Sequence, residues 1–170
     1  MTNPLDEPIE SFRTAADAFK VARHVLDGRP NPAADTRLDG LTQEEGHAML
    51  DRAEEQLDKL VAFALFAAFE RTLRDHLSAS LTSISASSTI PEELAAKLHR
   101  FLDDGVDRWR IDDVIKLFFP PVAQQDVENA KDIRSFRNDV AHGDAPADAI
   151  PPQTAYRQLT AFLTNAGLVS

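Results

Sequence analysis

The chain has 170 residues, 43% of them hydrophobic and 27% charged, a composition typical of a globular protein long enough to bury one core. It contains no cysteine, which excludes disulfides and thiolate metal sites, and no apolar run approaches the ~20 residues of a membrane span, so a cytoplasmic protein without membrane contact is expected. The formal net charge of −10 argues against a protein that coats nucleic acid with a broad basic surface.

The N-terminal segment is acidic and contains Pro4 and Pro8, so residues 1–8 are expected to form a flexible tail. Residues 9–170 are then expected to form one helical domain. Within it, apolar residues recur at intervals of three and four over residues 9–27, which predicts a first amphipathic helix. Glycine and proline residues end this helix at residues 28–32.

A long second helix is predicted after this loop. Thr42 and Glu45 have the spacing of a capping box, and Leu41 before them is placed as a hydrophobic staple. The apolar pattern continues to about Ser80, and nearly every residue over 61–69 is apolar. This segment should be buried on most sides, so the second helix is predicted to be the central helix of the core.

Four further helical segments follow in the chain. They are predicted at residues 91–103, 112–119, 123–142 and 153–165. In the third of these, Ile133, Phe136 and Val140 form one apolar stripe, and Gly143 supplies the helix stop. The sequence contains no convincing alternating strand pattern. The predicted fold class is therefore all-α, an up-and-down bundle of four to five main helices.

The helix predicted to end at His142 carries a dense group of polar residues between its apolar ones. Arg134, Arg137 and Asn138 precede the histidine within little more than two turns. An arginine binds phosphate through paired, charge-assisted hydrogen bonds, and a histidine exchanges protons near neutral pH. This set of residues predicts a site that holds a phosphate and moves a proton beside it.

The segment Arg137-Asn138-Asp139-Val140-Ala141-His142, followed by a glycine, resembles the R-N-x-x-x-H signature of HEPN domains. These are small all-α domains of many prokaryotic toxins and of some eukaryotic RNA-processing factors. Residues 69–74, on the long helix, are also similar to a segment that many of these domains carry. The resemblance implies a HEPN-like fold and a metal-independent endoribonuclease that needs no cofactor and leaves 2′,3′-cyclic phosphate ends, acting as a toxin or in defence.

The resemblance also assigns roles to individual residues. His142 would act as general acid or base, Arg137 would stabilise the phosphorane-like transition state, and Asn138 would orient the phosphate or hold the arginine or the histidine. Arg134, which the signature does not cover, would add a contact to the substrate phosphate. Glu70 on the long helix would pair with Arg137 or Arg134 and fix its geometry.

Helical geometry limits how these residues combine within one chain. Each residue turns an α-helix by about 100°, so Arg137 and His142 point about 140° apart and cannot reach one phosphate from a regular helix. Either the helix unwinds before Gly143, or two copies of the motif face each other. The HEPN resemblance implies the second arrangement, so a two-fold homodimer that binds its RNA substrate in a shared cleft is expected.

Other interpretations of these residues stay open. Arg137 and His142 would also stabilise a helix C-terminus through its dipole, and Glu70 and Arg74 have the spacing of an ordinary helix-stabilising pair. Trp109 would either stack on a base or fill the core. The other histidines lack the spacing of metal ligands, so no metal site is expected.

At the level of function, two alternatives compete with the ribonuclease. A non-catalytic HEPN interaction module, which pairs with a nucleotidyltransferase-type partner or binds nucleotides, agrees better with the net charge of −10. An antitoxin would be a further partner if the ribonuclease acts as a toxin. A structural helical bundle with a coincidental motif is the third interpretation.

Overall fold

The computed structural model describes residues 2–28, 36–85, 108–143 and 149–169, and a few residues between 91 and 105. The helices of this part are α1 (Asp6–Gly28), α2 (Gln43–Ser85), α4 (Ile111–Lys116), α5 (Gln124–His142) and α6 (Pro152–Asn165). The described residues form no strand, which confirms the all-α prediction. The helix predicted over residues 91–103 lies mostly outside the described residues. No helix in the described part combines the length and the apolar character that crossing a membrane requires.

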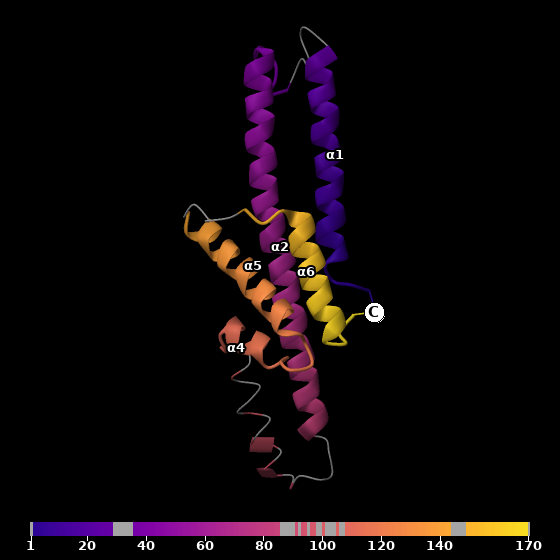
Figure 1. Cartoon of the computed structure of the whole chain (residues 1–170), viewed down its shortest axis with the longest axis vertical. Helices are drawn as coiled ribbons and strands as arrows, with labels where there is room; N and C mark the ends of the chain where they lie inside the picture. The colour runs from indigo at the N-terminus through magenta and orange to yellow at the C-terminus, as the bar shows by residue number, and fades with distance from the viewer. Residues whose placement is uncertain are drawn as a thin grey trace.

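Helix α2 is the element against which the other helices pack, as predicted (Figure 1). It has 43 residues and contacts α1, α4, α5 and α6. Its middle section supplies the buried side chains of Val61, Ala62, Leu65, Phe66, Phe69 and Leu73. Leu60, at the start of this apolar stretch, is exposed and lines an open apolar groove beside α1. The apolar face of α2 is therefore wider than the surface that its neighbours cover.

Aromatic rings connect α2 with the helices that follow it. The rings of Phe66 and Phe69 lie 5.8 Å apart, and Phe69 meets Phe162 of α6 edge to face at 5.1 Å. Phe162 in turn lies 5.8 Å from Phe118, which follows α4. Such pairs contribute about 0.5–1.5 kcal/mol beyond the burial of their surface. This chain of rings holds α6 and the α4–α5 connection on the middle of α2, and the buried Ile133 of α5 joins the same core.

The N-terminal residues differ from the expectation. Leu5 is fully buried and belongs to the core cluster, and its backbone N–H donates to the Asn3 side-chain oxygen at 3.1 Å. Asn3 also donates through its amide nitrogen to the Thr160 hydroxyl of α6, at 3.0 Å. The prediction of a flexible tail over residues 1–8 is therefore wrong for the described residues of that segment. The buried Leu5 and the hydrogen bond from Asn3 hold the segment on the bundle, which an acidic, proline-containing composition does not reveal.

The start of α2 confirms the predicted capping box. The backbone N–H and the hydroxyl of Thr42 both donate to Glu45 Oε2 at 2.8 Å, and the Glu45 N–H donates to the Thr42 hydroxyl at 3.3 Å. These bonds satisfy backbone groups that a helix start leaves without partners. The pKa of the Glu45 carboxyl is lowered below its ordinary value. The hydrogen bond from the Thr42 N–H is the larger cause, and the hydrogen bond from the Thr42 hydroxyl is the second.

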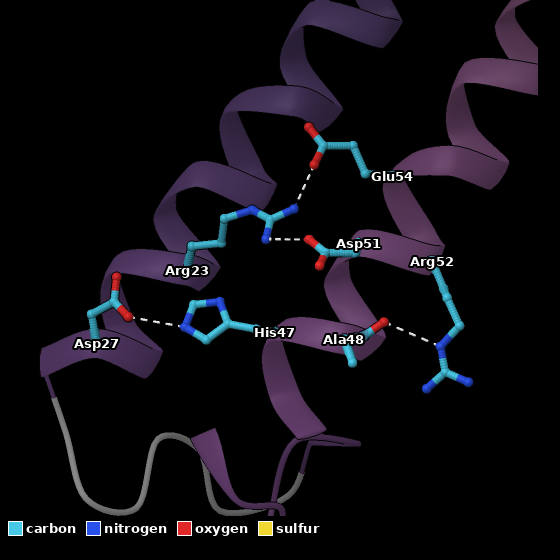
Figure 2. A network of polar contacts seen from close by, with 7 residues as sticks. All are labelled: Arg23, Asp27, His47, Ala48, Asp51, Arg52 and Glu54. Carbon is cyan, nitrogen blue, oxygen red and sulfur yellow. Dashed lines mark hydrogen bonds and ion pairs between the residues drawn. The ribbon is translucent and has the colours of Figure 1, made fainter. Parts of the chain in front are cut away.

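Helices α1 and α2 form an antiparallel hairpin, and its closed end extends away from α5 and α6 (Figure 1). Near this end, which we call the hairpin tip, Arg23 of α1 donates to Asp51 and to Glu54 of α2, each at 2.6 Å (Figure 2). Asp27 and His47 form a second link, with 2.9 Å between the carboxylate oxygen and the ring nitrogen. Polar contacts between side chains therefore join the two helices where the bundle no longer surrounds them.

Candidate functional site

The helix that carries the predicted motif is regular to its end. Helix α5 runs from Gln124 to His142, and Gly143 caps it in the left-handed conformation with φ of 77°. A Cβ at Gly143 would meet no atom within 4 Å, so the backbone angle and not the available space favours glycine there. The helix therefore does not unwind before Gly143. Of the two geometries considered for a joint use of Arg137 and His142, the unwound helix is excluded.

Arg137 points from α5 towards α2 and is held on three sides. Its guanidinium carbon lies 5.2 Å from the centre of the Phe66 ring, a distance suited to cation–π attraction. Nη1 donates to Asn138 Oδ1 at 3.1 Å, and Nη2 lies 3.5 Å from Glu70 Oε2. The Arg137 side chain keeps 29% of its surface exposed, so these contacts do not bury it fully.

Glu70 is shared between two arginines on different helices. Its Oε1 accepts from Arg74 Nη2 at 2.8 Å and from Arg74 Nε at 3.1 Å, while its Oε2 faces Arg137. The predicted pairing of Glu70 is therefore confirmed for Arg137, and its spacing to Arg74 also forms the predicted helix pair. We call Glu70, Arg74 and Arg137 the motif cluster. Its two guanidinium groups and one carboxylate give it a formal net charge of +1.

Arg134 has a different partner from the one considered for it. It forms an ion pair with Asp112 of α4, and both side chains are mostly buried. The second carboxylate oxygen of Asp112 is buried, and no described residue donates a hydrogen bond to it. Arg134 is thus neutralised within the chain and would have to leave Asp112 before it contacted a phosphate.

His142 and Asn138 occupy different positions relative to Arg137. Asn138 is half-buried and accepts a hydrogen bond from the arginine, which matches the role of holding that side chain. His142 is exposed at the last residue of α5 and lies about 140° around the helix from Arg137. The structure brings Arg137, Asn138 and Glu70 together in one chain. It does not bring His142 to them.

Sequence reasoning missed three contributors to this site. Phe66 was assigned to the core and Arg74 to an ordinary helix pair, and both also position Arg137 or its partner. Asp112 carried no signal, because its pairing with Arg134 depends on how α4 packs on α5. Trp109 packs against the core with its ring, as one of its two interpretations had it, while its backbone carbonyl accepts from Arg74 at 3.1 Å.

Among the described residues, no group of three or more histidine, aspartate or glutamate side chains is placed to hold a metal ion. Comparisons of the chain with protein-family models, with curated proteins and with solved structures found no match. The case for a function therefore depends on the motif residues, their contacts and the charge around them.

Proposed function

We propose that the protein is a metal-independent endoribonuclease of the HEPN type, which acts as a homodimer with the α5 ends of two protomers in a shared cleft. The observation that carries this proposal is the different placement of two motif residues on one regular helix. Arg137 is held against α2 within a cluster of net charge +1, and His142 is exposed at the capped helix end. Because one copy cannot aim both at a phosphate, a second copy completes the site.

The chemistry assigns one task to each group. The ribose 2′-oxygen forms a bond to the adjacent phosphorus, the bond from phosphorus to the 5′-oxygen breaks, and a 2′,3′-cyclic phosphate results. The 2′-hydroxyl loses its proton and the departing 5′-oxygen gains one, and His142 is suited to either transfer. Arg137 donates to the non-bridging oxygens, whose negative charge grows in the transition state. Asn138 keeps the guanidinium in position.

The first experiment measures RNA cleavage by the wild type, Arg137→Ala and His142→Ala, with a chelator present and with analysis of the product ends. The proposal expects cleavage with cyclic phosphate ends in the wild type and a loss of about 10²-fold or more in either variant. Equal activity of all three proteins would indicate a contaminating nuclease. Arg137 and His142 would then be interpreted as residues that stabilise the helix C-terminus. If all three are inert towards several RNAs, the interaction module becomes the better proposal.

A mixing experiment tests the shared cleft directly. Each active site would take Arg137 from one protomer and His142 from the other, so a dimer of one Arg137→Ala and one His142→Ala chain keeps one intact site. Random reassociation of equal amounts should restore about a quarter of wild-type activity, because half of the dimers are mixed and each has one intact site of two. A mixture that stays as inactive as its components would contradict a site built across two chains.

The net charge of −10 favours a second candidate function, a non-catalytic module that pairs with a nucleotidyltransferase-type partner or binds nucleotides. Growth of an expressing host separates the two candidates. An active ribonuclease used as a toxin or in defence harms its host, and His142→Ala relieves the harm. If the protein is a binding module, expression of the wild type and of His142→Ala should both leave growth unchanged.

A further inference from the structure

The two arginines of the motif cluster hold Glu70 unequally. Arg74 approaches one carboxylate oxygen with two nitrogens, at 2.8 and 3.1 Å, whereas Arg137 approaches the other oxygen with one nitrogen at 3.5 Å. Hydrogen bonds between charged groups weaken beyond about 3 Å, so Arg74 is the stronger partner of the carboxylate. Glu70 is therefore drawn along α2 towards Arg74 and away from a full pairing with Arg137.

Without Arg74, the same carboxylate would be able to close on Arg137. Arginine and a carboxylate prefer a fork-to-fork arrangement with two parallel hydrogen bonds, and one nitrogen of Arg137 already faces Glu70. In that state one guanidinium and one carboxylate remain, with a net charge of zero in place of +1. The donors of Arg137 would then point at Glu70, and a phosphate would have to displace it.

Arg74 is itself fixed by a contact outside α2. Its Nη2 also donates to the backbone carbonyl of Trp109 at 3.1 Å, and its side chain is only 17% exposed. A backbone carbonyl offers a permanent acceptor that does not titrate, so this contact restrains Arg74 at every pH. An ordinary exposed helix pair lacks such a restraint.

We propose that Arg74 is a positioning residue, which holds Glu70 away from Arg137 and so keeps the Arg137 guanidinium available to a substrate phosphate. The benefit to phosphate binding rests on the proposed ribonuclease function. The restraint on Glu70 does not, because it is a property of the chain without substrate. Arg74 acts through Glu70 and makes no contact with the reacting atoms.

The test compares Arg74→Gln with Arg71→Gln, which removes the same charge from an exposed position on the same helix. The first readout is the side-chain Nε–H signal of Arg137 in ¹⁵N-resolved NMR spectra of the protein without RNA. In Arg74→Gln, closure of Glu70 should shift this signal and slow its hydrogen exchange severalfold. In Arg71→Gln both should stay at their wild-type values, and thermal unfolding checks that each variant is folded.

The second readout is the affinity for a short oligoribonucleotide made uncleavable by 2′-O-methyl groups. Arg74→Gln should weaken binding about tenfold, the size of losing one charge-assisted contact. Adding Glu70→Gln to Arg74→Gln should restore most of this affinity, because the side chain that closes on Arg137 is then neutral. If Arg74 and Glu70 served only to stabilise α2, the additional Glu70→Gln substitution would not restore the affinity for RNA.

The outcomes separate the two proposals. An Arg137 signal that responds equally to Arg74→Gln and Arg71→Gln overturns the positioning role, whatever the RNA measurements give. A signal that responds only to Arg74→Gln, in a protein that neither binds nor cleaves RNA, supports the restraint on Glu70 and overturns the ribonuclease. If Arg74→Gln does not fold, Arg74→Lys keeps the charge without the fork, and an unchanged Arg137 signal in that variant counts against the proposal.

Discussion

The hairpin tip and the motif cluster use the same chemical groups with opposite results. Arg23 at the tip and Arg137 in the cluster are equally exposed, at 29% of their side-chain surface. Arg23, however, meets two carboxylates (Figure 2), and both are better exposed than Arg23 itself. Arg137 instead shares a single, mostly buried carboxylate with a second arginine. The tip contact has a net charge of −1 and the cluster has +1.

This difference teaches that the exposure of an arginine does not identify a phosphate site. The ratio of guanidinium groups to carboxylates is more informative, because an arginine with two acidic partners has no charge left for a ligand. The surroundings differ as well. The Arg137 guanidinium lies over the Phe66 ring, which orients it without neutralising it. At the tip, Arg23 instead donates to the two acids Asp51 and Glu54.

The largest expected effect separates the two arginines by activity. Arg137→Ala should lower the rate of RNA cleavage by about 10²–10³, as when one donor to a developing oxyanion is removed. Arg23→Ala should leave the rate within about twofold, because its charge is already used within the hairpin. Steady-state cleavage of one RNA by both variants checks this. Equal losses would mean that the tip also contributes to substrate binding.

The next largest effect is on the free energy of unfolding and concerns the ion pair between Arg134 and Asp112 beside the motif. Asp112→Ala should lower the free energy of unfolding by about 1–3 kcal/mol, because it leaves the mostly buried Arg134 without its charge partner. Asp113→Ala is the matched control, since Asp113 also lies in the first turn of α4 but pairs with Lys116 at the exposed surface. Urea unfolding of both variants measures the difference. Similar losses would show that the position near the helix start matters and the ion pair does not.

A smaller effect is expected when the tip contact itself is removed. Arg23→Ala should destabilise the protein less than Asp112→Ala, because the carboxylates around Arg23 stay hydrated after its loss. The effect should also shrink in 1 M salt, where the Debye length is about 3 Å. Unfolding at low and high salt measures both points. A salt-independent loss would indicate that the packing of the Arg23 stem, and not its charge, holds the hairpin.

The smallest expected effect is a pH dependence at the tip. The hydrogen bond from His47, and then that from Gln43, lowers the pKa of Asp27 below its ordinary value of 3.8. A lowered folded-state pKa gives stability that is fully present above the unfolded value of 3.8 and is lost as the pH falls through the lower folded value.

The difference in unfolding free energy between the wild type and His47→Ala should therefore narrow as the pH falls below 3.8. His24→Ala serves as the control, since His24 is exposed and lowers the Asp27 pKa only through the weakest of the contributing interactions. Acid titration of the urea midpoint measures the effect. A difference that widens in acid would contradict the assigned cause.

The sequence by itself predicted the helices and the local features of the candidate site. The capping box at Thr42, the extent of α5 and the stop at Gly143 follow from backbone hydrogen bonds and from side chains a few residues apart. Such interactions depend on local conformation, so the pattern of residue types contains them. The polar residues of the motif could be named for the same reason, because helical periodicity separates them from the buried stripe.

Only the tertiary structure decided how these residues are paired. Glu70 and Arg137 are 67 positions apart, and Asp112 reaches Arg134 from another helix. Leu5 likewise became a core residue only when the N-terminal segment docked. A guanidinium has the same affinity for any carboxylate of equal geometry, so composition offers many equivalent pairs. The packing of α2, α4 and α5 selects among them, and this selection leaves the motif cluster, Arg137 included, with a net charge of +1.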